Sequence, residues 1–369
     1  MKQTLGLYIH IPFCKAKCAY CDFYSLARSE SRMDAYVAAL RSSLRAAAPK
    51  AAAYTVDTVY FGGGTPSFLG AARLCAALET VFSSFSVAPD AEITFEENPE
   101  SNRDGSALRT LRGAGFNRVS LGMQSADDTE LCAIGRIHSA SDTVAAVEAA
   151  RSAGFDNLSL DLIYGLPSQT RGRWRENLAA AAALAPEHLS CYGLKVEPGT
   201  PLDARRGGLA LPDDDAQADM YLSCAEFLEP YGYRQYEISN FSRPGYESRH
   251  NLKYWTLGEY LGFGPGAHSD FGGRRFAVAR DLNAFLAGHA AYSEDAAITP
   301  RERAAERVML GLRLTRGLAA EELAGAEAVL RECAAHGLAE QSGGRWRLTP
   351  QGFLVSNAII LQVQEAMGL

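Results

Sequence analysis

The sequence predicts an α/β protein in which parallel strands alternate with helices, followed by a smaller C-terminal domain. Short apolar, β-branched runs recur with helical stretches between them along the first 200 residues. Strands that alternate with helices in this way are normally parallel and joined by right-handed crossovers. The unusual polar residues stand near the ends of the predicted strands. The chain has 369 residues, 47% of them hydrophobic and 21% charged, which is enough for one large and one smaller domain.

Six strands are predicted before residue 200, each short and rich in branched or aromatic residues. Their alternation with helices fits either a barrel or an open doubly wound sheet. The predicted strands are Leu5–Ile11, Thr55–Phe61, Glu92–Phe95, Arg118–Gly122, Asn157–Ile163 and His188–Leu194. The predicted helices are Met33–Ala48, Ala71–Phe85, Arg103–Ala114, Asp127–Ile134, Ser141–Ala153 and Gly172–Leu184.

In either architecture, functional loops lie at the carboxyl ends of the strands, so polar residues there are candidate site residues. These residues come from segments that are far apart in the chain, which is typical of a site assembled by the fold. In chain order they are the cysteines after the first strand, Gly62-Gly63-Gly64-Thr65-Pro66 after the second, Glu96-Glu97-Asn98-Pro99 after the third, Gln124-Ser125 after the fourth, and Asp161 within the fifth.

The pattern changes after Pro198. A helix is predicted from Pro212-Asp213-Asp214-Asp215 through Leu228, because aspartates suit the positive end of the helix dipole. Residues 231–273 are rich in glycine and aromatic residues. From about Arg301 the pattern indicates helices and then a small hairpin, as in a winged helix. The predicted domains are 1–200, a linking region 201–300, and a winged-helix-like domain 301–369.

Charge and hydropathy exclude several classes of protein. The chain has 36 basic and 43 acidic residues, a formal net charge of −7, so we expect no nucleic-acid partner. The N-terminal apolar stretch already contains His10 and Pro12, unlike a signal peptide, and no segment reaches the roughly 20 apolar residues of a membrane span. We therefore expect a cytoplasmic protein whose eight cysteines are reduced.

Three of these cysteines are clustered as Cys14-x-x-x-Cys18-x-x-Cys21. A closed structural zinc site needs four ligands, and no second Cys-x-x-Cys or His pair is present, so zinc or a redox thiol pair is the weaker interpretation. Three thiolates would leave one iron of a four-iron cluster open to a ligand. The remaining cysteines stand singly among apolar residues and are expected in the core: Cys75, Cys132, Cys191, Cys224 and Cys333.

The motifs together resemble the radical S-adenosylmethionine (SAM) superfamily. They are the three-cysteine motif with Tyr20 before its last cysteine, and Gly62-Gly63-Gly64-Thr65-Pro66. Leu7-Tyr8-Ile9-His10-Ile11-Pro12-Phe13-Cys14 and Asp161-Leu162-Ile163-Tyr164-Gly165-Leu166-Pro167 resemble the branch that contains oxygen-independent coproporphyrinogen III dehydrogenase and the heme chaperone HemW. This resemblance covers essentially the whole chain.

The resemblance implies a partial (β/α)6, TIM-like radical-SAM barrel with a [4Fe–4S] cluster on Cys14, Cys18 and Cys21. By motif position it also implies a SAM site made by Tyr8, Tyr20, Gly63, Gly64, Thr65, Glu96, Gln124, Arg136 and Asp161. Glycines allow close backbone approach to a ligand, and the Arg136 fork suits a carboxylate. Without the resemblance, the glycines are a tight turn and the polar residues are strand ends or helix caps.

Two functions remain open within this branch: a radical decarboxylase and a heme carrier. The dehydrogenase pattern has another cysteine two residues after the third cluster cysteine, whereas this chain has Asp22-Phe23. The chain also begins only a few residues before its first strand. Both features match the heme-chaperone pattern. We therefore expect a heme carrier, and an enzyme that decarboxylates two coproporphyrinogen propionates is the alternative.

A heme-binding signature, His-Asn-x-x-Tyr-Trp, matches His250, Asn251, Tyr254 and Trp255. His250 is a candidate heme ligand and the aromatic residues candidate porphyrin contacts. The alternative is a hydrogen-bonded histidine among core aromatics. The expected cofactors are the [4Fe–4S] cluster, SAM and heme. The expected partners are heme-accepting respiratory proteins and an electron donor, a homodimer is left open, and the expected placement during heme delivery is membrane-peripheral.

Overall fold

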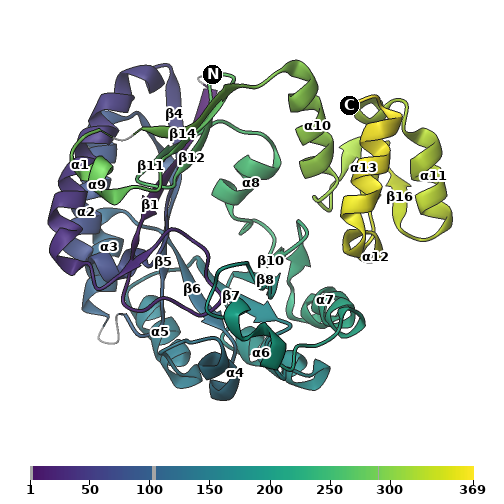
Figure 1. The fold of residues 1–369 in the computed structure, drawn as a ribbon, viewed down its shortest axis with the longest axis horizontal. Coiled ribbons are helices and arrows are strands. Elements are labelled where there is room, and N and C mark those ends of the chain that lie inside the picture. The colour runs from purple at the N-terminus through teal and green to yellow at the C-terminus, as the bar shows by residue number, and fades with distance from the viewer. Residues whose placement is uncertain (1–2, 102–104, 290) are drawn as a thin grey trace.

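The computed structural model describes residues 3–101, 105–289 and 291–369. Six parallel strands form a partial barrel with helices on its outside, which confirms the predicted fold class (Figure 1). The strands are β1 (Gln3–Ile11), β4 (Tyr54–Gly63), β5 (Val87–Glu97), β6 (Arg118–Gln124), β7 (Leu158–Tyr164) and β8 (His188–Gly193). The helices between them are α1 (Met33–Ala47), α2 (Ala71–Ser84), α3 (Ser106–Ala114), α4 (Asp128–Ala133), α5 (Ala140–Ser152) and α6 (Arg171–Ala183).

Some strand ends differ from the prediction. Glu96 lies inside β5 and not after it, and Gln124 is the last residue of β6. The predicted start of one helix at Arg103 lies outside the described residues, and α3 begins at Ser106 after Gly105, which adopts a left-handed conformation. Both strands are longer than their apolar runs because polar residues continue the pairing into the site.

The sheet continues beyond both edges of the barrel, which the sequence did not predict. Its full order is β14-β13-β12-β11-β1-β4-β5-β6-β7-β8-β10-β9. On one side β11 (Tyr260–Phe263) pairs parallel with β1 and leads into antiparallel β12 (His268–Phe271), β13 (Arg274–Val278) and β14 (Tyr292–Ala297). On the other side β10 (Asn240–Ser242) pairs antiparallel with β8 and with β9 (Arg234–Gln235). Because the outermost strands do not pair, the barrel stays open.

Helix α8 (Arg249–Trp255) sits inside the arc of strands and not on its outside (Figure 1). Its first backbone amides, those of Arg249 and His250, donate to the buried carboxylate of Glu92 on β5, at 3.1 and 3.0 Å. Lys253 forms an ion pair with Asp57, with 2.7 Å between Nζ and Oδ1. The helix is therefore fixed to the strands at both of its ends.

The C-terminal segment has its own apolar cluster, built around Leu323, Trp346 and Val363. Its elements are α10 (Pro300–Gly311), β15 (Leu318–Ala319), α11 (Glu327–Ala335), β16 (Ala339–Ser342), β17 (Arg345–Leu348), α12 (Pro350–Leu354) and α13 (Ser356–Ala366). Three short antiparallel strands in the order β15-β17-β16 lie beside these helices. The predicted strand around Trp346 is therefore present as β17.

The isolated cysteines divide between the core and the surface. Cys191, Cys224 and Cys333 are buried as predicted, Cys75 is half-buried and packs against the core, and Cys132 is exposed, so the prediction was wrong for Cys132. Cys75 and Cys132 lie on outer helices, α2 and α4, whose apolar stripe covers only one face. Among the described residues, no helix is long and apolar enough to cross a membrane.

Candidate functional site

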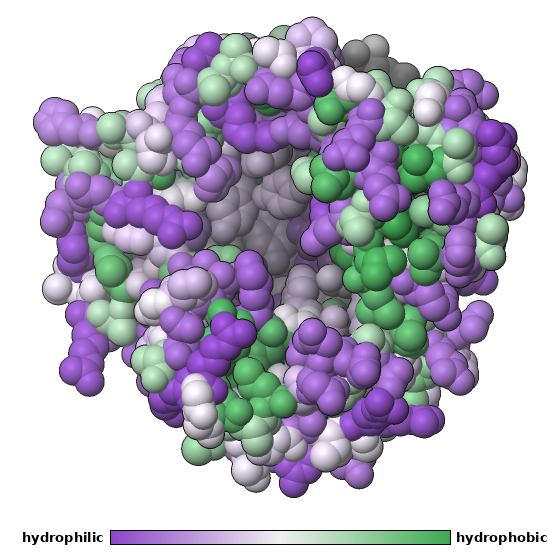
Figure 2. All heavy atoms as spheres, turned by 45° about the vertical axis from the view of Figure 1, so that its right-hand side comes forward, coloured by the Kyte–Doolittle hydropathy of each residue, from purple (hydrophilic) through white to green (hydrophobic). Residues whose placement is uncertain are grey.

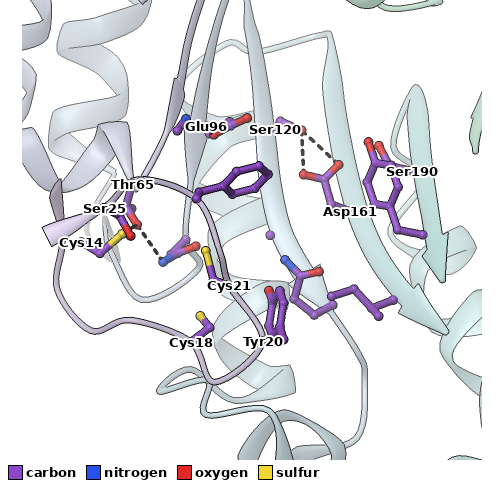
Figure 3. A pocket seen from close by; sticks show the side chains of 18 of the residues that line it. Cys14, Cys18, Tyr20, Cys21, Ser25, Thr65, Glu96, Ser120, Asp161 and Ser190 are labelled. Atoms are coloured by element: carbon purple, nitrogen blue, oxygen red, sulfur yellow. Dashed lines mark hydrogen bonds between the residues drawn. The ribbon is translucent and has the colours of Figure 1, made fainter. Parts of the chain in front are cut away.

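A cavity of about 390 Å³ opens at the carboxyl ends of the barrel strands and extends into the barrel. Its volume lies within the roughly 300–1,000 Å³ range of small-molecule sites. Figure 2 shows the face on which the molecule is deeply hollowed at its centre, with a largely hydrophilic rim. In the close-up view, Cys14, Cys18 and Cys21 lie on one side, with Ser120, Asp161 and Ser190 across from them (Figure 3).

The structure brings most of the predicted site residues to this one cavity. Those that line it are Cys14, Cys18, Tyr20, Cys21, Gly63, Gly64, Thr65, Glu96, Gln124, Arg136, Asp161 and Asn251. They come from all parts of the barrel and from α8. Tyr8, His250, Tyr254 and Trp255 are not among the lining residues.

The glycine turn after β4 holds the loop that carries the cysteines. The Gly64 amide donates to the Ile11 carbonyl and the Thr65 amide to the Phe13 carbonyl, both at 2.8 Å. The Thr65 hydroxyl then donates to the Cys14 sulfur at 3.5 Å. Two consecutive backbone bonds therefore fix the end of β1 just before the first cysteine.

These contacts require glycine because the backbones approach so closely. A Cβ at position 64 would lie 2.7 Å from the Phe13 carbonyl oxygen and 2.8 Å from that of Ile11. At Gly63, φ is +110°, and a Cβ would lie 2.5 Å from the His10 ring. The His10 Nε2 lies 2.8 Å from the Tyr24 carbonyl oxygen on the far side of the cysteine loop. His10 is therefore a packing and anchoring residue.

Glu96 is a fully buried carboxyl group beside the glycine turn. Its Oε1 accepts from the Tyr60 hydroxyl at 2.9 Å and its Oε2 from the Gly63 amide at 3.1 Å. Burial raises the pKa of Glu96 to about 7, although these two hydrogen bonds oppose the shift. Near neutral pH this group therefore changes between a neutral and a charged acceptor.

Arg136 connects the cysteine loop to β6. Its Nη1 donates to the Cys18 sulfur at 3.4 Å and to Asn98 Oδ1 at 3.1 Å, and its Nη2 donates to the Gly122 carbonyl at 2.8 Å. The buried Nε has no partner among the described residues. Arg136 therefore ties Cys18 to Asn98 and to the backbone of β6.

Asp161 lies on β7 and faces the cavity. It accepts from the Ser120 hydroxyl at 3.1 and 3.3 Å. Burial raises the pKa of Asp161, and hydrogen bonding from Ser190 and the charge of Arg118 oppose the shift. The carboxylate can therefore still accept hydrogen bonds from a ligand hydroxyl or amine.

Tyr8 lies behind the cavity wall in an aromatic stack. Its ring stacks on those of Tyr60 and His250, with centroids 6.2 and 6.4 Å apart, and its hydroxyl lies 3.1 Å from His10 Nδ1.

The candidate heme segment forms α8, and its histidine is closed in. His250 is only 1% exposed. Its Nδ1 lies 2.8 Å from the Thr58 hydroxyl and its Nε2 lies 2.8 Å from that of Tyr254. Burial lowers the pKa of His250 to about 3, so the ring is neutral at physiological pH. With both ring nitrogens occupied, neither is available to a metal unless one of these bonds breaks.

Sequence reasoning missed several residues that line the cavity, notably Tyr60, Arg118, His188 and Tyr192. A signal for Arg118 was present: Arg118, Ser120 and Gln124 occupy alternate positions on β6, and alternate strand residues face the same side. The period-two polar pattern on a predicted barrel strand indicates residues inside the barrel.

The residues at the cavity mouth fit an iron–sulfur cluster. Cys14, Cys18 and Cys21 are free and line one cavity. Burial raises the pKa of Cys14 and that of Cys21, the latter to about 11, so positive charge from iron is needed to keep these sulfurs deprotonated. Among the described residues, no three His, Cys, Asp or Glu side chains converge closely enough for a single metal ion.

Two family models match the chain. The radical SAM superfamily model matches residues 8–181, which include the cysteine motif and most of the barrel. The HemN C-terminal domain model matches residues 298–355.

Curated relatives match over most of the chain. The heme chaperone HemW of Mycobacterium tuberculosis is 40% identical over 374 aligned residues, covering 97% of this chain and 94% of that protein. The heme chaperone HemW of Bacillus subtilis is 35% identical, covering 95% of this chain and 97% of that protein. The heme chaperone HemW of Escherichia coli is 41% identical over 72% of this chain and 69% of its own length.

A solved structure also matches over nearly the whole chain. It is coproporphyrinogen III oxidase (HemN) from Escherichia coli, described as a radical SAM enzyme. It superposes with a TM-score of 0.84 at 25% identity, covering 98% of this chain and 90% of that one.

We expect Gly64→Ala to impair cluster assembly. The added Cβ would meet backbone carbonyl oxygens of Phe13 and Ile11, and neither can move without shifting the start of the cysteine loop. Anaerobically reconstituted variant should retain less than half of the iron, sulfide and charge-transfer absorbance of the wild type (about 1 kcal/mol of distortion is enough for this).

The matched control is Gly113→Ala on α3, where a Cβ would meet nothing within 4 Å. It should keep full cluster content and be slightly more stable, since alanine favours a helix. Wild-type iron and sulfide in folded Gly64→Ala would contradict the close backbone approach described above.

Proposed function

Since the chain belongs to the radical SAM superfamily and, within it, to the heme chaperone HemW family, we propose that it is a heme chaperone that uses a [4Fe–4S] cluster and SAM and delivers bound heme to acceptor proteins. One observation carries the proposal beyond the family: three free thiols and the predicted SAM-site residues from β4, β5, β6 and β7 line one cavity.

In this proposal Cys14, Cys18 and Cys21 hold the cluster, and the glycine turn, Glu96, Gln124, Arg136 and Asp161 hold SAM. Residues 1–200 contain all of these groups, and residues 201–300 contribute α8, which lies inside the arc of strands. When bound, a [4Fe–4S] cluster with SAM supplies one-electron reduction and a route to an organic radical. The protein's own contribution is to orient the ligands and to exclude water through the buried walls of the cavity.

A second candidate is radical decarboxylation of coproporphyrinogen. It is favoured by the overall likeness to coproporphyrinogen III oxidase of Escherichia coli. Against it, Phe23 stands where that pattern has a cysteine, and it is 63% exposed and lines the cavity. An apolar ring at this position suits contact with a flat apolar ligand better than redox or proton-transfer chemistry.

The test is to purify the full chain anaerobically, reconstitute the cluster, titrate hemin by absorbance and assay the same sample for coproporphyrinogen decarboxylation. We expect stoichiometric hemin binding, transfer of heme to an apo-cytochrome acceptor, and no decarboxylation. Decarboxylation without specific hemin binding would replace the proposal by the second candidate. A sample without iron and sulfide would overturn the cluster assignment.

We expect His250→Ala to destabilise the protein without abolishing hemin binding. The substitution removes a buried ring and leaves the Thr58 and Tyr254 hydroxyls without their partner, at a cost of about 3 kcal/mol. Urea unfolding measures the loss, and hemin titration of the folded variant should show an unshifted Soret band.

His336→Ala is the control for the effect of losing an exposed histidine, and it should leave both measurements unchanged. If folded His250→Ala loses the wild-type Soret position while His336→Ala keeps it, His250 is a heme ligand after all, and α8 must open on binding.

We expect SAM affinity to rise between pH 6 and pH 8. The pKa of Glu96 is raised to about 7, so its carboxyl group becomes the charged, stronger acceptor as the pH rises through this value. A single group of this pKa changes affinity by up to about tenfold over that range. Anaerobic calorimetry at several pH values measures the slope.

Glu96→Gln should bind SAM more weakly at pH 8 and lose most of the slope, whereas Glu79→Gln on the surface of α2 should keep it. A slope that survives unchanged in Glu96→Gln would assign the titration to another group, including SAM itself.

A further inference from the structure

Arg118 is a buried cation for which the described residues supply no hydrogen-bond or ion-pair partner. It is 1% exposed and is among the largest fully buried side chains. Its buried Nε has no partner, and no ion pair within 4 Å is found for its guanidinium among the described residues. Leaving the donors of a buried guanidinium without hydrogen bonds is costly, so a guanidinium that lines a cavity in this state indicates a ligand that accepts hydrogen bonds from it.

Arg118 lies at the inner end of the cavity. It begins β6, whereas Gln124 ends the same strand beside the cysteine loop. Six residues of strand span about 20 Å. At the same inner end, His188 begins β8 and is neutral, because burial, and next the charge of Arg118, lower its pKa well below the usual value. Arg118 would therefore contact the part of a ligand that lies at the inner end of the cavity, and not the part near the cysteine loop.

Part of the cavity lining suits a flat apolar body. Phe23 is 63% exposed and Tyr192 is 42% exposed, and both line the cavity together with Tyr60 and Ile163. Aromatic faces that remain open in a cavity offer stacking surface to a ring system. The cavity thus combines open aromatic rings with a buried cation, Arg118, and its other cationic lining residues are Lys17, Arg136 and Lys195.

The carboxyl groups near Arg118 limit the charge of the ligand group. Glu96 and Asp161 both interact with the guanidinium through space, but neither is hydrogen-bonded to it. Their negative charge disfavours a doubly charged phosphate more strongly than a singly charged carboxylate. The planar guanidinium fork also matches a carboxylate in two parallel hydrogen bonds.

We propose that Arg118 binds a peripheral carboxylate of the porphyrin, whose ring lies against Phe23 and Tyr192 in the same cavity. This rests on the proposed heme-carrier function and adds to it where the ligand lies and which group orients it. The site is independent of His250, which faces Thr58 and Tyr254 and does not line the cavity.

The experiment compares hemin with hemin dimethyl ester, which has the same ring without free carboxylates. Each is titrated into the reconstituted full chain as wild type, Arg118→Gln, Arg118→Lys and Arg175→Gln. Arg175 is an exposed arginine on α6 and controls for loss of a positive charge. Circular dichroism and SAM affinity are measured on each sample.

We expect wild type to prefer hemin over its ester by about tenfold or more, the range of a charge-assisted hydrogen-bonded pair. Arg118→Gln should lose this preference by weakening only hemin binding. Arg118→Lys should recover part of it, and Arg175→Gln should behave as wild type. A merely structural role for Arg118 would weaken both ligands equally.

Three results would overturn the inference. One is a preference for hemin that persists in Arg118→Gln, and another is equal weakening of both ligands. The third is weaker SAM binding in Arg118→Gln with unchanged hemin binding, which would assign Arg118 to the carboxylate of SAM. If wild type binds neither hemin nor its ester, the heme-carrier function itself fails, and the inference fails with it.

Discussion

The close approach of two backbone segments, the glycine turn after β4 and the end of β1, is the contact on which the rest of the site depends. Gly64 and Thr65 donate to the carbonyls of Ile11 and Phe13 at 2.8 Å, a separation that leaves no room for a Cβ at position 64. The same turn places the Gly63 amide on Glu96 and the Thr65 hydroxyl on Cys14. One contact therefore sets the cysteine loop and the β5 carboxyl group relative to each other.

A second constraint is that the barrel is filled from inside by α8. Its amides bond to Glu92, and its His250 ring stacks on Tyr60, whose hydroxyl bonds to Glu96. The two ring centroids lie 5.3 Å apart and the ring planes are 26° from parallel, which is a stacked arrangement. His250 is thus packed against Tyr60, whereas Asn251 of the same signature lines the cavity directly. A signature motif fixes residue types, but the hydrogen bonds decide whether a histidine is available to a metal.

Much of the barrel could be predicted because its signals are local. The strands β1, β4, β5, β6, β7 and β8 are apolar runs bounded by polar residues, and a parallel sheet brings their carboxyl ends together, so Cys14, Gly64 and Asp161 could be placed at one edge. The strands at the two edges of the sheet could not be predicted in this way. The parallel pairing of β11 with β1 joins Gly6 to Tyr260, and β14 is exposed along its length, so neither has a clear period-two apolar pattern. Likewise, the resemblance implies that Tyr8 is at the SAM site, but its stacking against Tyr60 is a tertiary contact that the sequence does not reveal.

The electrostatics of the barrel interior explain why its polar groups can remain in an otherwise apolar core. Glu96 and Asp161 are buried, yet each accepts hydrogen bonds, and the charge of Arg118 partly offsets the cost of burying them. The two carboxyl groups do not offset the cost of burying Arg118 to the same degree. They attract its charge through space but accept no hydrogen bond from it. An apolar side chain at position 118 would avoid this cost. Val119 and Leu121, which follow on the outer face of β6, are apolar and buried. The cost of burying an arginine there is explained if a ligand completes its hydrogen bonds.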